Sequence, residues 1–190
     1  MGWSDWSKRS AYLLVQTDWG AGEKLFKDVQ KWDETIGAWM VTGPWDLMIW
    51  VDAKNWEDLY KKAVWLRNQK GVKATSSHFV YKGMKNDKWW WDWAAGAWVM
   101  VRSPHLNGEI KQLSQWNWAT SAASIPGDWD YVAWIGGKKW EEVWDHIGEM
   151  NKNGWHTQTL VPLKSWWNKN WKNSWWTNAQ ESSKEFAWSK

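Results

Sequence analysis

The fold of this chain is decided by a stretch that occurs twice: GPWDLMIWVDAKNWE at residues 43–57 and GDWDYVAWIGGKKWE at residues 127–141. The two copies lie 84 positions apart and share seven identical residues. Replacements between them mostly keep their character, as when Val51 becomes Ile135. One supersecondary unit used twice explains this pattern. Because two copies are too few for a solenoid, we expect two similar halves that bury a shared face.

Bulk composition excludes several classes of protein. The 190 residues carry a net charge of +3, with positive and negative side chains interspersed, which is typical of a solvated surface and not of a nucleic-acid tract. The absence of cysteine excludes disulfides, thiolate nucleophiles and cysteine metal sites. Residues 1–10 lack the apolar core of a secretory signal, and no apolar run reaches membrane-spanning length. We therefore expect a cytoplasmic protein without a membrane partner.

Tryptophan is unusually abundant, with 27 copies. A domain of this size cannot bury so many large indoles completely, so some of them should be exposed in clusters at 89–93 and 166–176. Exposed aromatic clusters mark interfaces or ligand surfaces. We expect them to pack over the sheet faces or to form a surface for self-association.

Hydrophobic periodicity gives the same order of elements in both halves. In the first half it predicts strands at 11–15, 36–42, 45–51 and 72–81, with helices beginning near Glu23 and after Asn55. In the second half it predicts strands at 97–102, 118–125, 129–135 and 155–163, with helices at 106–116 and 139–151. This is the βαββαβ order of a ferredoxin-like unit, in which two helices cover one face of a four-stranded antiparallel sheet.

The predicted fold class is therefore α+β, with two tandem ferredoxin-like βαββαβ repeats. The strands are almost continuously apolar, as at 45–51, which indicates that both sheet faces are buried. We expect the two four-stranded sheets to pack together as a pseudo-dimer, an α+β barrel. The predicted divisions are an N-terminal extension (1–10), a first repeat (11–82), a Trp-rich linker (83–95), a second repeat (96–164) and a Trp-rich tail (165–190).

Three segments of the first repeat resemble the Lrp/AsnC effector-binding domain. They are AYLLV at 11–15, GAWMVTGPWDL at 37–47 and GVKATSS at 71–77, and they match the family's first strand, its Thr-Gly-x-aromatic-Asp-Leu turn and its final strand. The resemblance covers about residues 10–84 and extends more weakly to 93–164. It implies an amino-acid-sensing module used in transcription regulation, which pairs through its sheets and assembles into homo-oligomers. Since ten residues precede Ala11, we expect no DNA-reading helix-turn-helix, and any nucleic-acid contact would need a separate DNA-binding subunit.

The resemblance also implies which residues would bind a small-molecule effector. Carried over position by position, they are Gly43, Asp46, Thr75, Ser77, Gly127, Asp130, Thr157 and Thr159. A carboxylate near hydroxyls and free backbone N–H groups could hold an ammonium and a carboxylate together. The alternative interpretation is that Asp46 and Asp130 cap the hairpin turns while the hydroxyls merely decorate a strand.

Catalytic signatures are largely missing from the sequence. No phosphate-binding loop, dinucleotide fingerprint or nucleophile elbow occurs, and no histidine stands at metal-ligand spacing. We predict no catalytic residue, no metal and no cofactor, and the leading hypothesis is a non-enzymatic amino-acid-binding regulatory module. The first alternative is an α+β-barrel enzyme or haem-binding protein, for which His78 and His156 on the final strands are the candidates. The second alternative is a self-assembling structural protein without a ligand.

Overall fold

The computed structural model describes residues 9–85, 94–104, 113 and 116–168. In these residues the first half contains β1 (Arg9–Thr17), α1 (Ala21–Val29), β2 (Thr35–Thr42), β3 (Leu47–Ala53), α2 (Trp56–Arg67), β4 (Val72–Phe79) and β5 (Lys82–Lys85). The second half contains β6 (Ala95–Arg102), β7 (Ala119–Ser124), β8 (Tyr131–Gly137), α3 (Trp140–Lys152) and β9 (His156–Trp167). The helix predicted at 106–116 and most of the tail fall outside the described residues.

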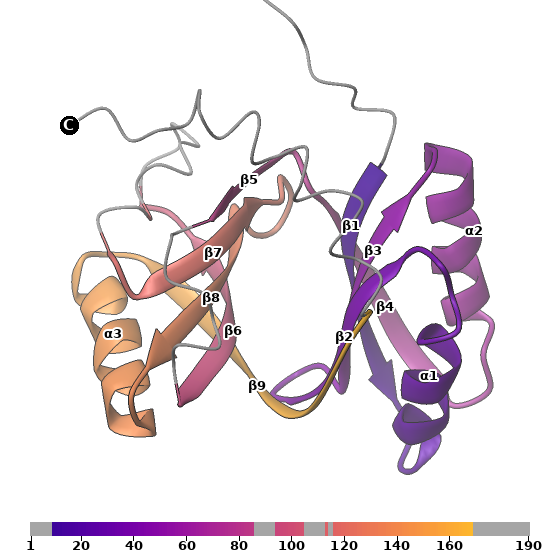
Figure 1. The fold of residues 1–190 in the computed structure, drawn as a ribbon, viewed down its shortest axis with the longest axis horizontal. Helices are drawn as coiled ribbons and strands as arrows, with labels where there is room; N and C mark the ends of the chain where they lie inside the picture. Colours follow the sequence, from indigo (N-terminus) through magenta and orange to yellow (C-terminus); the bar gives the residue numbers. More distant parts are fainter. Residues whose placement is uncertain (1–8, 86–93, 105–112, 114–115, 169–190) are drawn as a thin grey trace, which may run out of the picture.

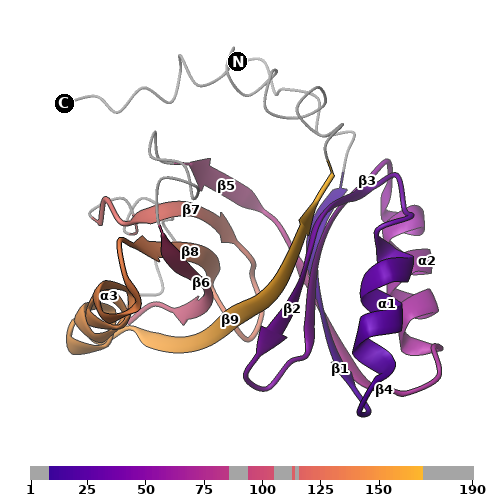
Figure 2. The ribbon, with the colours of Figure 1, turned by 60° about the horizontal axis from the view of Figure 1, so that its bottom comes forward.

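All strands belong to one antiparallel sheet with the order β4-β1-β3-β2-β9-β6-β8-β7-β5. The predicted arrangement of two separate four-stranded sheets is therefore wrong. The strand β9 pairs with strands of both halves, and β5 of the first half pairs with β7 of the second. The first part of β9 pairs with β6, up to Leu160 opposite Trp98, and the second part pairs with β2, from Val161 opposite Thr42. Figure 2 shows β9 running from one half to the other.

The two ends of this strand order meet, so the sheet closes on itself. β4 pairs with β1, and β5, which follows after Val80 and Tyr81, pairs with β7. The N–H of Val80 donates to Ser10, and the N–H of Tyr81 donates to Ser124, which carries the hydrogen bonding across the junction. The strand β5 lies partly in the segment predicted to be a linker. The coarse prediction of an α+β barrel describes this closed sheet.

Helices cover the outer side of the sheet. Figure 1 shows α1 and α2 over the strands of the first half, and α3 over those of the second half. Beneath α1 and α2 lies one buried cluster that includes Leu13, Leu25 and Ile49, and beneath α3 lies another that includes Val99, Val143 and Met150. The helix α2 begins at Asn55, whose side chain accepts a hydrogen bond from the N–H of Asp58, as an N-cap should. No helix among the described residues has the length and apolarity needed to cross a bilayer.

A third buried cluster fills the inside of the barrel. It contains side chains from both halves, namely Tyr12, Leu14, Trp39, Val41, Met48, Trp98, Met100, Ala123, Ile125, Val132 and Leu160. The rings of Trp39 and Trp98 meet edge to face with centroids 5.0 Å apart. The expectation that the apolar strands bury both faces is confirmed by β3, in which every residue except the half-buried Trp50 is buried.

Candidate functional site

The two predicted aspartates lie at corresponding hairpin turns and bind the backbone there. The carboxylate of Asp46 accepts from the N–H of Thr17 at 2.6 Å and from its hydroxyl at 3.2 Å. The carboxylate of Asp130 accepts from the N–H of Ser103 at 2.7 Å. Each aspartate therefore ties its turn to the end of a neighbouring strand. This geometry matches the capping role, and ligand binding by either aspartate stays a prediction.

The glycines of these turns have different surroundings. Gly43 has a φ of 119°, and a Cβ there would lie 3.1 Å from the carbonyl oxygen of Thr159, so the first turn packs closely on β9. Gly127 has a φ of 153°, and a Cβ there would meet no atom nearer than 4.0 Å. The structure thus brings Gly43 beside Thr159 but gives Gly127 no such contact.

The four predicted hydroxyl residues lie on the outer side of the sheet. Thr75 and Ser77 stand opposite Val15 and Leu13, whose side chains belong to the cluster beneath α1 and α2. Thr157 and Thr159 stand opposite Val101 and Val99, which lie in the cluster under α3. They therefore point away from the inside of the barrel, because paired residues of an antiparallel ladder share a face. Thr75 lines a small hollow of about 200 Å³ with Arg67 and Lys73, and Thr157 donates to Asn151 at 3.0 Å.

His78 lies on the inner face of β4. It stands opposite Tyr12, which belongs to the cluster inside the barrel, and it is 6% exposed. Its Nε2 and the hydroxyl of Ser76 form a hydrogen bond of 2.9 Å. Burial lowers the pKa of the His78 imidazole, and the carboxylate of Asp128 opposes this more weakly. His78 is therefore a neutral imidazole at pH 7, with one nitrogen fixed by Ser76.

The β7–β8 turn and the end of β6 form the surroundings of His78. Asp128, in this turn, acts electrostatically on His78. Arg102, the last residue of β6, donates from two nitrogens to the carbonyl oxygen of Asp128, at 3.1 Å for Nε. Its guanidinium also lies 5.5 Å from the ring centroid of Trp129. A neutral imidazole and a guanidinium are therefore both linked to Asp128 in the β7–β8 turn, the first through its charge and the second through hydrogen bonds. The imidazole can accept a proton or ligate a metal, and the guanidinium can bind a carboxylate.

Aromatic rings line the barrel beyond this point. Tyr12 stacks on Trp50 at 5.5 Å and meets Trp98 at 5.7 Å, and burial raises the pKa of its phenol. The indole Nε1 of Trp98 is buried and has no hydrogen-bond partner in the described part of the chain. Sequence reasoning named His78 only as an alternative and missed Ser76, Arg102 and Asp128. The spacing of Ser76 and His78, two residues apart on one strand, was the available signal, because it places both on one face.

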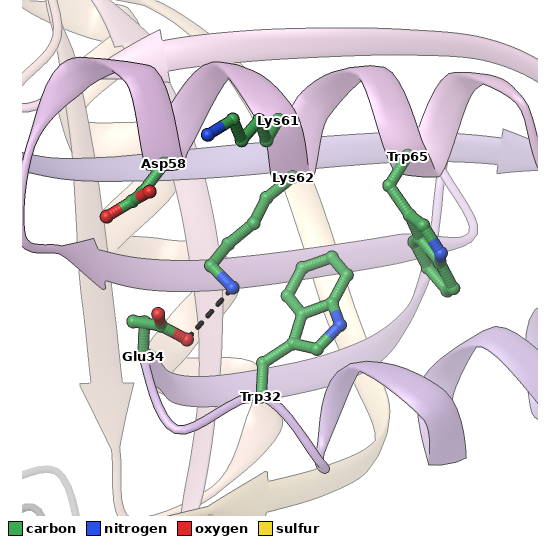
Figure 3. A pocket seen from close by; sticks show the side chains of 6 residues that line it. All are labelled: Trp32, Glu34, Asp58, Lys61, Lys62 and Trp65. Atoms are coloured by element: carbon green, nitrogen blue, oxygen red, sulfur yellow. Dashed lines mark ion pairs between the residues drawn. The ribbon is translucent and has the colours of Figure 1, made fainter.

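A second hollow lies on the outer side of the first half, with a volume of about 260 Å³. Figure 3 shows Lys62 reaching from α2 towards Glu34, with the rings of Trp32 and Trp65 on the other side of the hollow. Lys62 and Glu34 form an ion pair of 2.9 Å, and both are half-buried. Burial alone would raise the pKa of Glu34, but hydrogen bonds from Lys62 and from its own backbone, with nearby lysine charge, outweigh it and leave that pKa below its ordinary value.

Comparison with known proteins identifies the first half. Residues 10–90 match the model of the Lrp/AsnC ligand binding domain, so the resemblance drawn from the sequence is confirmed there. Among curated proteins, none matches this chain.

Solved structures show the fold of the whole chain. The siroheme decarboxylase NirDL aligns over 94% of this chain and 80% of its own, with a TM-score of 0.64 and 10% identity. The same enzyme with an iron-uroporphyrin III analogue aligns over 83% and 72%, with a TM-score of 0.61 and 8% identity. An anthrone oxidase-like protein aligns over 86% and 94%, with a TM-score of 0.53 and 10% identity. At these identities the likeness establishes the fold and not the activity.

The leading functional prediction is contradicted by these comparisons. A non-enzymatic amino-acid-binding module acting through assembly was expected, whereas the whole-chain likenesses fall on a decarboxylase and an oxidase-like protein. The alternative hypothesis, an α+β-barrel enzyme or haem-binding protein, fits the findings better.

Proposed function

We propose that this chain is an α+β-barrel protein that binds an iron tetrapyrrole at the end of its barrel, beside His78. The observation that carries the proposal is the buried, neutral imidazole of His78 on the inner face of the sheet. Neutral imidazole is a common protein ligand for haem iron. The structural likeness to a siroheme decarboxylase, one structure of which contains an iron-uroporphyrin III analogue, supports the same class of ligand.

The residues present fit such a group at the end of the barrel but not deep inside it. His78 offers the ligating nitrogen, and Arg102 offers a guanidinium for a peripheral carboxylate. The Nε1 of Trp98, a member of the interior cluster, has no partner among the described residues and is a further donor. Beyond it, Trp98 and Met100 fill the barrel and are 3% and 0% exposed. The macrocycle would therefore lie against the end of the barrel, next to the β7–β8 turn.

Each residue of the site has a defined task in this proposal. An iron tetrapyrrole supplies redox and Lewis-acid chemistry when bound. Ser76 holds the ring of His78 in its orientation through their hydrogen bond, as outer partners of metal-ligating histidines do. Arg102 would bind a carboxylate of such a group, and its bonds to Asp128 hold the turn in place. The packed indoles exclude water from the inner side of the site.

Titration with haemin and with iron-uroporphyrin III tests the proposal, with the Soret band as the readout. We expect a shifted band for the unmodified protein, and a loss of affinity of at least about tenfold for His78→Ala, since removing even an outer partner of a metal ligand costs this much. His146→Ala is the matched control, because His146 is a histidine on α3, on the outer side of the sheet. Equal binding by both variants, or no band shift in the unmodified protein, would reject the proposal.

Internal duplication is also part of the proposal. It is supported by the repeated segment and by matching backbone hydrogen bonds. The N–H of Asp46 donates to Val15, and the N–H of Asp130 donates to Val101. The two aspartates lie 84 positions apart in the sequence, and the two valines lie 86 positions apart. Assembly into homo-oligomers and a cytoplasmic location stay predictions. Native mass spectrometry measures the first of them directly.

A further inference from the structure

The hollow on the outer side of the first half is separate from the His78 site, because it lies on the other face of the sheet. It is formed by the residues that follow α1 and by one side of α2. Its lining residues are Trp32, Glu34, Asp58, Lys61, Lys62 and Trp65. The indoles of Trp32 and Trp65 meet edge to face, with centroids 5.1 Å apart and planes at 77°. They form a partly exposed aromatic corner beside an ion pair (Figure 3).

The second half holds the same backbone arrangement 84 positions later. The N–H of Thr35 donates to Trp32 at 3.1 Å, as that of Ala119 donates to Trp116 at 3.1 Å. The carbonyl of Glu34 accepts from Asp52, and that of Trp118 accepts from Gly136. Lys62 and His146 both lie seven positions after the N-cap of their helix. Trp118 therefore occupies the place of Glu34, and His146 the place of Lys62.

In the second half an aromatic side chain fills this place. The indole of Trp118 stacks on His146 at 4.5 Å with planes 8° apart, and on Trp116 at 5.2 Å with planes 19° apart. Trp118 is 7% exposed, so its ring is buried within the stack, while His146 is half-buried. In the first half Glu34 brings no ring, and the hollow remains. The second half thus shows that this backbone arrangement can hold a flat aromatic ring in the place that corresponds to Glu34.

We propose that the hollow binds a planar heteroaromatic ring in the place that Trp118 fills in the second half. The ring would stack on one indole of the Trp32–Trp65 corner and meet the other edge-on, which is a favoured arrangement of aromatic groups. Its edge would meet the Glu34–Lys62 pair, in which a carboxylate acceptor stands beside an ammonium donor. A volume of about 260 Å³ admits one ring or two fused rings.

The charges of the lining favour an uncharged ring. The carboxylates of Glu34 and Asp58 are balanced by the ammonium groups of Lys61 and Lys62. All four have partners: Glu34 pairs with Lys62, Lys61 pairs with Glu57 at 2.8 Å, and Asp58 accepts from Asn55 at 2.9 Å. An anion or a cation would have to break one of these pairs. A neutral ring with donors and acceptors on its edge, of the purine type, would not.

Adenine, benzoate and benzamidine are suitable probes, measured by saturation-transfer NMR and calorimetry. For so small a ligand we expect a Kd on the order of 1 mM for adenine. Benzoate and benzamidine should bind more weakly, since each carries a charge. AMP separates the two sources of a purine: binding as tight as that of adenine indicates a nucleotide, and weaker binding indicates a free base. No adenine binding, or tighter binding of either charged probe, would overturn the proposal.

The double variant Glu34→Trp/Lys62→His copies the second half into the first. It should fill the hollow and weaken adenine binding at least about tenfold, a change well outside calorimetric error. Asp18→Trp/Lys73→His is the matched control, because it introduces the same residue types at an ion pair whose side chains are both exposed and do not line the hollow. Undiminished adenine binding by the double variant would refute the assignment.

Two further measurements keep the test decisive. Trp65→Ala removes one wall of the corner from outside the buried core, and it should also abolish binding if the double variant fails to fold. Haemin titration of the double variant should match that of the unmodified protein, because His78 lies on the inner face of the sheet. Failure of the hollow and failure of the His78 site are therefore distinguishable.

Discussion

Asp46 holds Thr17 through both its backbone N–H and its hydroxyl, at 2.6 and 3.2 Å, and so fastens the β2–β3 turn to the end of β1. We predict that Asp46→Ala lowers the free energy of unfolding by about 1–2 kcal/mol, because the N–H of Thr17 loses its partner in a half-buried place. Asp46→Asn should lose less, since the amide oxygen can still accept. Urea denaturation measures both, and Asp33→Ala at an exposed position is the control. Equal stability of Asp46→Ala and the unmodified protein would contradict the capping role.

The Glu34–Lys62 pair should contribute to stability in a pH-dependent way. Lys62 pairs with Glu34 at 2.9 Å and lies 4.7 Å from the ring centroid of Trp32. We expect Lys62→Ala to cost about 1 kcal/mol at neutral pH, from the ion pair and the cation–π contact together.

The sign of the pH dependence follows from the lowered pKa of Glu34. The contribution of this pair to the free energy of unfolding is fully present above the ordinary glutamate pKa of 4.5. It is lost as the pH falls through the lower pKa that Glu34 has in the folded protein. The difference between Lys62→Ala and the unmodified protein should therefore shrink in acid. A difference that stays constant down to about pH 3 would assign the effect to packing alone.

His78 should make the protein less stable in mild acid. Its folded pKa lies below the ordinary 6.5 because of burial, so the unfolded chain takes up the proton first as the pH falls. The free energy of unfolding is then highest above about pH 6.5, and it decreases as the pH falls from there through the pKa of His78 in the folded protein. His78→Gln should reduce this decline, as seen in urea denaturation at about pH 7.5 and about pH 5.5.

His146 contributes a second, similar effect that the experiment must separate. Burial lowers the pKa of His146 as well, with Glu142, Glu149 and Asp145 opposing it. The double variant His78→Gln/His146→Gln should show a flatter pH profile than either single variant. A profile unchanged by His78→Gln would mean that His78 is not kept neutral by the fold.

Gly96 has no room for a side chain. A Cβ there would collide with the indole of Trp134, which packs directly on this position. We predict that Gly96→Ala destabilises the protein by about 1–3 kcal/mol through overpacking. Gly148→Ala is the matched substitution, since no atom lies within 4 Å of its added Cβ and it lies in α3. It should raise stability by about 0.5–1 kcal/mol, and thermal melting distinguishes the two.

Local patterns predicted most of the elements but not how the strands join. The predicted strand at 97–102 lies within β6, and the predicted helix at 139–151 nearly coincides with α3. Such elements follow from periodicity and from signals such as the Asn55 cap. In contrast, most of β5 lies in the predicted linker, and the last residues of β9 lie in the predicted tail. Their partners, β7 and β2, are remote in sequence, and the alternation within a strand does not specify which edge it joins.

The candidate site was predicted less well for a related reason. Family resemblance directed attention to Thr75 and Ser77, whereas the inward residues are their neighbours Ser76 and His78. One position along a strand changes the face, and the face is fixed by the pairing with Tyr12 and Leu14. The contributions of Arg102 and Asp128 come from the other half of the chain, so no local pattern could place them beside His78.

Because β5 and β9 each pair with a strand of the other half, this protein is a candidate for fragment complementation. A chain cut between β5 and β6 leaves a first fragment whose β5 belongs beside β7, and a second fragment whose β9 belongs beside β2. Neither fragment can satisfy its own sheet edges, so mixing them should restore a single folded complex. The same interdependence should make the uncut protein melt in one transition, since losing either half exposes a strand edge in the other.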